Sequence, residues 1–97
     1  MSQLHNYSFF YRKLAAGCIF SLGDAAGGAE KELGVTATEA ECENLVRTKE
    51  PTATGATWGD PILMGSNDTR HGYCWAEFGT HVAPHSYFRS CIFGGIF

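Results

Sequence analysis

Four cysteines, at positions 18, 42, 74 and 91, constrain the fold of this 97-residue chain more than any other feature. A chain of this length forms a single domain with a small core, so cross-links add much of its stability. The cysteines are separated by 23, 31 and 16 residues, with no C-x-x-C pair. This spacing disfavours a zinc site or a thioredoxin-like site. An even, widely spaced set instead predicts two disulfide bonds, for which three pairings exist.

The composition narrows the class of protein. Hydrophobic residues make up 44% of the chain and aromatic residues 13%, enough for a core and too many for a disordered segment. The chain has seven basic and ten acidic residues, and the basic residues do not form the cluster that is typical of a nucleic-acid-binding protein. The chain contains no run of 18 apolar residues, the length that would predict a membrane span. We therefore expect a small secreted module without nucleic-acid partners.

The first residues have some features of a signal peptide. Arg12 and Lys13 precede the short apolar segment 14–22, and alanines follow it. Cleavage there would remove Cys18 and leave an odd number of cysteines. We therefore expect any signal sequence to lie outside these residues, with Met1 either a start residue or an interior residue of a longer precursor.

One helix is predicted in the charged middle of the chain. Thr38 and Glu41 form a T-x-x-E capping box, in which each side chain satisfies an amide of the first helical turn. Pro51 ends the helix. An apolar stripe at helical spacing should face the core, with the charged residues in solvent. The stripe consists of Cys42, Leu45, Val46 and the stem of Lys49.

Strands are predicted on both sides of this helix, and they suggest how the cysteines pair. Segments 14–22, 54–58, 71–78 and 87–93 are apolar or alternate in polarity, whereas the glycine-rich segment 23–28 is predicted to be a flexible loop. Alternation puts Cys74, Ala76 and Phe78 on the inner face of their strand. A Cys42–Cys74 bond would then join helix to sheet, and a Cys18–Cys91 bond would join the first and last core strands.

Three stretches resemble the apple/PAN-like modules of secreted invertebrate proteins: residues 41–59 (ECENLVRTKEPTATGATWG), 73–79 (YCWAEFG) and 87–93 (YFRSCIF). The resemblance implies an α+β fold with one helix packed on a curved antiparallel β-sheet, cross-linked by two disulfides. It extends over residues 14–93. Apple domains of the blood-protease type have a second helix cysteine where this chain has Val46, so the resemblance is to a two-disulfide version. Such modules bind proteins or carbohydrates and are not enzymes.

Several residues are candidates for modification in a secreted protein. Asn6 and Asn67 begin N-x-S/T sequons, in polar or turn-like surroundings, and are predicted to carry N-glycans. The threonines that follow Pro51 are weaker candidates for O-glycosylation. These are Thr52, Thr54 and Thr57.

No catalytic or metal-binding motif is evident. His81 and His85 have the H-x-x-x-H spacing of helical metal ligands, but Pro84 between them disfavours a helix, so we expect surface histidines and neither a metal nor a cofactor. Nucleophile motifs, phosphate-binding loops and paired carboxylates are not recognisable, which predicts a protein that is not an enzyme. Trp58, Trp75 and nearby tyrosines either fill the core or stack on sugar rings.

The two ends of the chain favour self-assembly. Residues 1–13 are predicted to be an aromatic β segment, exchanged between subunits, that precedes the apple/PAN-like domain of residues 14–97. A monomer rarely exposes such segments, so they should cover their own sheet or that of a neighbouring copy. We expect an extracellular fibre or matrix subunit whose partners are other copies of itself. The alternative is a monomeric lectin-like module that binds glycans or extracellular proteins. The predicted assembly contacts are Tyr7, Phe9, Phe10, Tyr11, Ile96 and Phe97.

Overall fold

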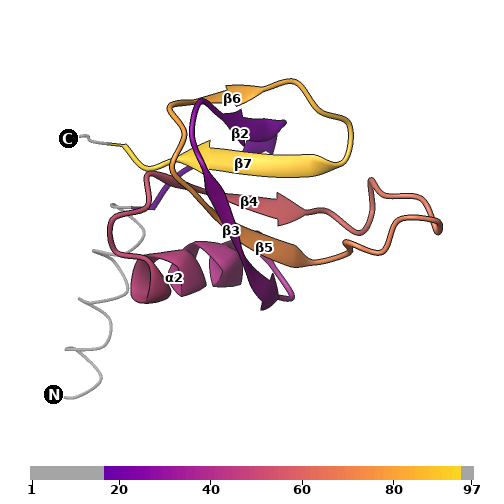
Figure 1. Ribbon diagram of the computed structural model, residues 1–97. Coiled ribbons are helices and arrows are strands. Elements are labelled where there is room, and N and C mark those ends of the chain that lie inside the picture. The colour runs from indigo at the N-terminus through magenta and orange to yellow at the C-terminus, as the bar shows by residue number, and fades with distance from the viewer. Residues whose placement is uncertain (1–16, 95–97) are drawn as a thin grey trace, which may run out of the picture.

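The computed structural model describes residues 17–94 and places one helix on an antiparallel sheet. In the described part, five strands form the main sheet in the order β1-β7-β4-β5-β3, and β2 and β6 form a separate pair. Figure 1 shows α2 on one side of the main sheet and the β2–β6 pair on the other. The elements are β1 (Ser21–Leu22), β2 (Asp24–Ala26), β3 (Glu30–Val35), α2 (Glu39–Lys49), β4 (Gly55–Gly59), β5 (Tyr73–Glu77), β6 (His81–Ala83) and β7 (Phe88–Ile92).

The helix begins and ends where the sequence predicted. The amide of Glu41 donates to the Thr38 hydroxyl at 3.1 Å, and the Glu41 carboxylate accepts from the Ala37 amide at 2.9 Å. Both acceptors satisfy amides that precede the first intrahelical hydrogen bonds. The helix ends at Lys49, before Pro51. The Thr38 cap and the stop at proline are therefore confirmed, whereas Glu41 reaches back to the Ala37 amide, one residue before the cap, instead of to an amide of the first turn.

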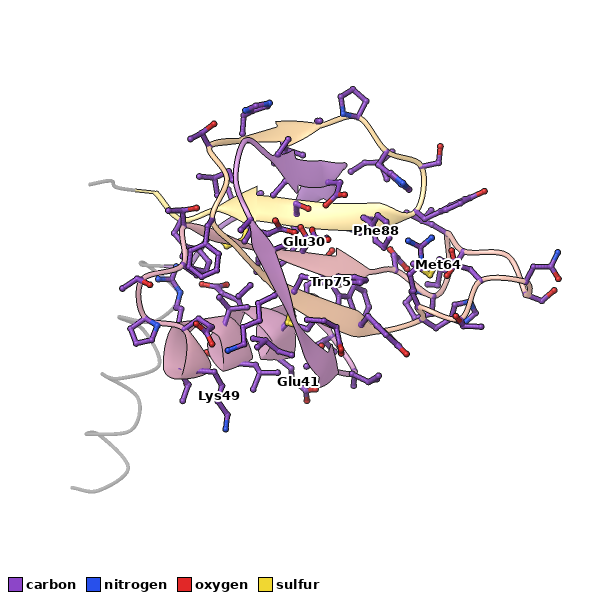
Figure 2. The ribbon with its side chains drawn as sticks, viewed as in Figure 1. Glu30, Glu41, Lys49, Met64, Trp75 and Phe88 are labelled. Carbon is purple, nitrogen blue, oxygen red and sulfur yellow. A yellow bond between two sulfur atoms is a disulfide. The ribbon has the colours of Figure 1, made fainter. Side chains whose placement is uncertain are left out.

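The predicted inner face of the helix needs two corrections. Cys42 and Val46 are fully buried, as expected, but Lys49 is exposed. Glu41 and Lys49 point away from the sheet (Figure 2). Glu43 is buried instead of lying in solvent, because its carboxylate accepts from Nε of Arg47 at 2.8 Å and from the Cys18 amide at 3.3 Å.

Two disulfides join the elements as predicted, and the α+β fold class is confirmed. Cys42 of α2 is bonded to Cys74 of β5, and Cys18 to Cys91 of β7, with Cα–Cα distances of 5.5 and 5.7 Å. The fully buried centre of the core between helix and sheet is made of small residues, so the helix packs close to the central strands. Its most buried members are Cys42, Val46, Ala56, Cys74, Ala76 and Cys91.

The strand predictions for the second half of the chain are confirmed, but those for the first half are partly wrong. Within segment 14–22, only Ser21–Leu22 is a strand among the described residues. Segment 23–28 is not a simple loop, because it contains β2, which pairs with β6. Gly23 permits this turn: its φ is +144°, and a Cβ atom there would lie 2.5 Å from the Ala83 carbonyl oxygen. Strands β3 and β6 were not predicted.

No helix in residues 17–94 is both long and apolar enough to cross a membrane.

Candidate functional site

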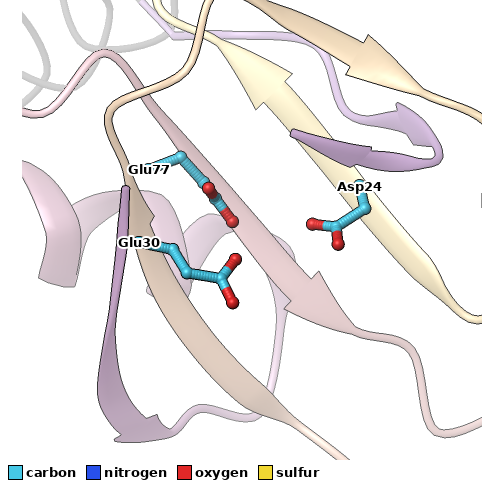
Figure 3. A group of neighbouring side chains, drawn as sticks. All are labelled: Asp24, Glu30 and Glu77. Carbon is cyan, nitrogen blue, oxygen red and sulfur yellow. The ribbon is translucent and has the colours of Figure 1, made fainter. Parts of the chain in front are cut away.

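Three carboxylates converge on the sheet face opposite the helix. Asp24 comes from β2, Glu30 from β3 and Glu77 from β5. One carboxylate oxygen of each lies within 4.8 Å of those of the other two. Figure 3 shows the three side chains pointing toward a common centre. Glu30 and Glu77 are register partners on adjacent strands, so the pairing of β3 with β5 brings these two acids together.

Glu77 is the unusual member of this cluster. Its side chain is only 1% exposed, and within the described chain its Oε2 atom has no hydrogen-bond partner. The pKa of Glu77 is raised to about 8: burial is the main cause, the neighbouring Glu30 and Asp24 also raise it, and a hydrogen bond with Thr57 lowers it. A buried acceptor without a partner is costly, so this carboxyl group needs a proton or a bound cation.

Two buried hydroxyls form the floor of the site. Thr57 on β4 and Ser90 on β7 are register partners, and their hydroxyl oxygens lie 2.6 Å apart. Ser90 donates to the Gly23 carbonyl at 2.8 Å, which holds the start of β2 against the main sheet. Thr57 lies 3.5 Å from Oδ1 of Asp24, whose pKa is raised mainly by burial. The hydroxyl pair therefore anchors the strand that carries the third acid.

The open side of the site is a small cavity with aromatic walls. Its volume is about 60 Å³. Trp75 and Phe88 meet edge to face, with ring centroids 5.3 Å apart. The Arg70 guanidinium lies 4.8 Å from the centroid of the Phe88 ring and donates to both carboxylate oxygens of Asp68, at 3.0 and 2.7 Å. The lining residues are Asp24, Glu30, Thr57, Arg70, Trp75 and Phe88.

The predicted modification sites have different surroundings. Asn67 is exposed in the connection between β4 and β5, so a glycan there meets no obstacle from the fold. Thr52 is exposed as well. The Thr54 hydroxyl donates to the Gly79 carbonyl at 2.6 Å. Thr57 is 1% exposed beneath β2, so the predicted O-glycosylation of Thr57 is incompatible with the folded protein.

Of the two histidines, His85 lies in the connection between β6 and β7, as the loop prediction expected, whereas His81 is part of a strand. His81 begins β6, where it is exposed, and its Nδ1 lies 3.1 Å from the Thr80 hydroxyl. His85 stacks on Phe88, with ring centroids 4.5 Å apart. The structure describes one group of three possible metal ligands in residues 17–94, and neither histidine belongs to it. The other predicted site residues, Asn6, Tyr7, Phe9, Phe10, Tyr11, Ile96 and Phe97, lie outside the described residues.

The sequence contained little that would have identified the acidic cluster. Its members are at positions 24, 30 and 77, without a recognisable spacing. The one available signal was alternation, which put Glu77 on the same face as Trp75, opposite to the cysteine face. On that side of the sheet the β2–β6 pair packs over β4 and β7, a contact that the sequence pattern did not reveal.

Comparisons with known proteins add no functional assignment. No family model matches the sequence, and neither a curated protein nor a solved structure matches the chain.

Proposed function

We propose that this protein is a secreted, non-enzymatic structural module that assembles with other copies of itself. The two disulfides are compatible with an oxidising extracellular environment. The resemblance to apple/PAN-like modules, which bind proteins or carbohydrates, agrees with this class of function. Exposed Asn67 is compatible with a glycoprotein.

The open outer edge of β3 is the observation on which this proposal depends. β3 is the last strand of the main sheet and, among the described residues, pairs only with β5. The Phe78 amide donates to the Ala29 carbonyl at 2.9 Å. This bond identifies Ala29 and Phe78 as a hydrogen-bonded pair between the two strands. Because hydrogen-bonded and non-hydrogen-bonded pairs alternate, the peptide groups of Glu30 and Glu32 point outward. Their N–H and C=O groups are available for hydrogen bonds to a further strand.

The N-terminal aromatic segment is the proposed occupant of this edge. Residues 4–13 are β-prone and precede the first cysteine, so a neighbouring copy can insert them as a sixth strand. Arg12 and Lys13 are opposite in charge to Glu30 and Glu32, which favours this strand over other partners. Val35, 66% exposed on β3, would be covered. A head-to-tail contact of this kind produces a filament, or a ring if it closes.

Light scattering on the purified chain tests the proposal. We expect the intact chain to form oligomers and a variant without residues 1–13 to be monomeric. Glu32→Pro removes one outward amide, and proline is tolerated on an edge strand, so it should also give monomers. Glu32→Thr removes the same charge but keeps the amide and should still assemble. Disulfide mapping confirms that each variant is folded. An intact chain that stays monomeric at high concentration would refute the proposal.

A row of rings favours a second candidate, a lectin-like binding module. Consecutive ring centroids are 4.5 to 5.8 Å apart along the face opposite the helix. Tyr87, at one end, is 40% exposed. Such rings stack on sugars or on apolar side chains of a partner. A glycan array probed with the chain and with Tyr87→Ala tests this candidate, since only the original chain should bind. The row runs through Tyr73, Trp75, Phe88, His85 and Tyr87.

A further inference from the structure

We propose that Asp24, Glu30 and Glu77, together with the Thr57 hydroxyl, form a binding site for a calcium ion. The proposal is independent of self-assembly. It rests on two separate observations: the convergence of three carboxylates within 4.8 Å, and the buried Glu77 side chain, whose Oε2 lacks a partner in the described chain and faces the other two acids (Figure 3). Oxygens this close can all reach one ion at calcium–oxygen distances of about 2.3–2.6 Å.

The donor atoms and the space select the kind of cation. All of the ligands are oxygens, which suit hard cations such as calcium, magnesium and manganese rather than copper or zinc. Three carboxylates supply up to six oxygens, the lower end of the coordination number of calcium. A volume of about 60 Å³ leaves room for one or two waters of roughly 30 Å³ each. Magnesium usually keeps several waters, so calcium fits better. The cavity is too small to hold a sugar ring.

The neighbouring positive groups leave the three acids available to the ion. Arg70 lines the cavity, but its guanidinium donates to both oxygens of Asp68, which offsets its charge. Lys31 follows Glu30 in sequence and bonds to Glu50 at 2.9 Å instead. Among the described residues, the only other base whose charge acts on Asp24 is His85.

Binding must compete with the proton on Glu77. The raised pKa of about 8 means that calcium displaces one proton from this carboxyl at neutral pH. The association constant should therefore rise by up to tenfold per pH unit between about pH 6 and about pH 8. An affinity in the range of extracellular calcium modules, about 10⁻⁴–10⁻³ M, is expected.

Calorimetric titration of the full chain with calcium chloride, after treatment with a chelator, tests the proposal. We expect one site per chain, an affinity that rises with pH, and a higher Tm with calcium than with sodium chloride of equal ionic strength. Glu77→Gln and Asp24→Asn should each weaken binding at least tenfold. Glu32→Gln is the matched control, since it removes an exposed carboxylate on β3, two residues after Glu30. Its affinity should stay within twofold of the original.

A terbium probe locates the ion and remains informative if one variant does not fold. Trp75 lines the cavity, whereas Trp58 lies on the other face of the sheet and donates to the Thr36 carbonyl. Excitation of tryptophan should sensitise terbium emission, which calcium displaces. Trp75→Phe should abolish that emission, although Trp58 remains. No saturable calcium binding by the original chain, or equal binding by Glu77→Gln, would overturn the proposal.

Discussion

Replacing the buried Glu77 with glutamine should change how the stability of the metal-free protein depends on pH. The pKa of Glu77 is raised from 4.5 to about 8 in the folded state, chiefly by burial. Below about pH 4.5 the carboxyl is protonated in both the folded and the unfolded chain, so its ionisation does not lower the free energy of unfolding. Between these two values the unfolded chain has lost the proton and the folded chain keeps it. The free energy of unfolding therefore falls as the pH rises.

The size of this effect follows from the shift. Each pH unit between 4.5 and about 8 lowers the free energy of unfolding by about 1.4 kcal/mol, which sums to about 5 kcal/mol as an upper bound. A domain of this size is stable by roughly 5–15 kcal/mol, so the loss would be large. Above about pH 8 both states are ionised and the loss is complete. Glutamine cannot ionise, so Glu77→Gln should lack most of this slope. In this variant the free energy of unfolding should still fall slightly as the pH rises, because the pKa of Asp24 is also raised.

Urea denaturation at a series of pH values, with a chelator present, measures the difference. We expect the original chain to lose stability steadily from about pH 5 to about pH 8 and the variant to be much flatter. Glu32→Gln, which alters an exposed acid on the neighbouring strand β3, should follow the original curve. Parallel curves for Glu77→Gln and the original chain would refute the reasoning, because Glu77 would then ionise alike in both states.

Three further perturbations test other parts of the structure. Replacing Cys42 and Cys74 together by alanine should lower the free energy of unfolding by about 3–4 kcal/mol, measured in urea, because the bond closes a loop of 32 residues; no loss would contradict this pairing. Thr38→Ala should cost about 1 kcal/mol in the same assay, whereas Thr36→Ala, outside the cap, should cost less. Mass spectrometry of secreted protein should find hexosamine on the peptide that contains Asn67, and a consistently unmodified peptide would contradict the prediction.

Local signals and alternating polarity were enough for the helix, the later strands and the disulfides. The T-x-x-E box and Pro51 fix the ends of α2 through hydrogen bonds between residues close in sequence. Alternation put Cys74 on the inner face of β5, and the helical stripe put Cys42 opposite it. These features depend on short-range chemistry and on periodicity, both of which are visible in a single sequence.

The acidic site depended on the tertiary structure. Strand β3 begins with three charged residues of low β-propensity, and it is a strand because it pairs with β5. That pairing puts Glu30 beside Glu77, and the turn at Gly23 brings Asp24 over them. Each acid alone resembles an ordinary surface charge. Their shared environment arises from contacts between strands that are distant in sequence, and burial of Glu77 follows only when those strands close over it.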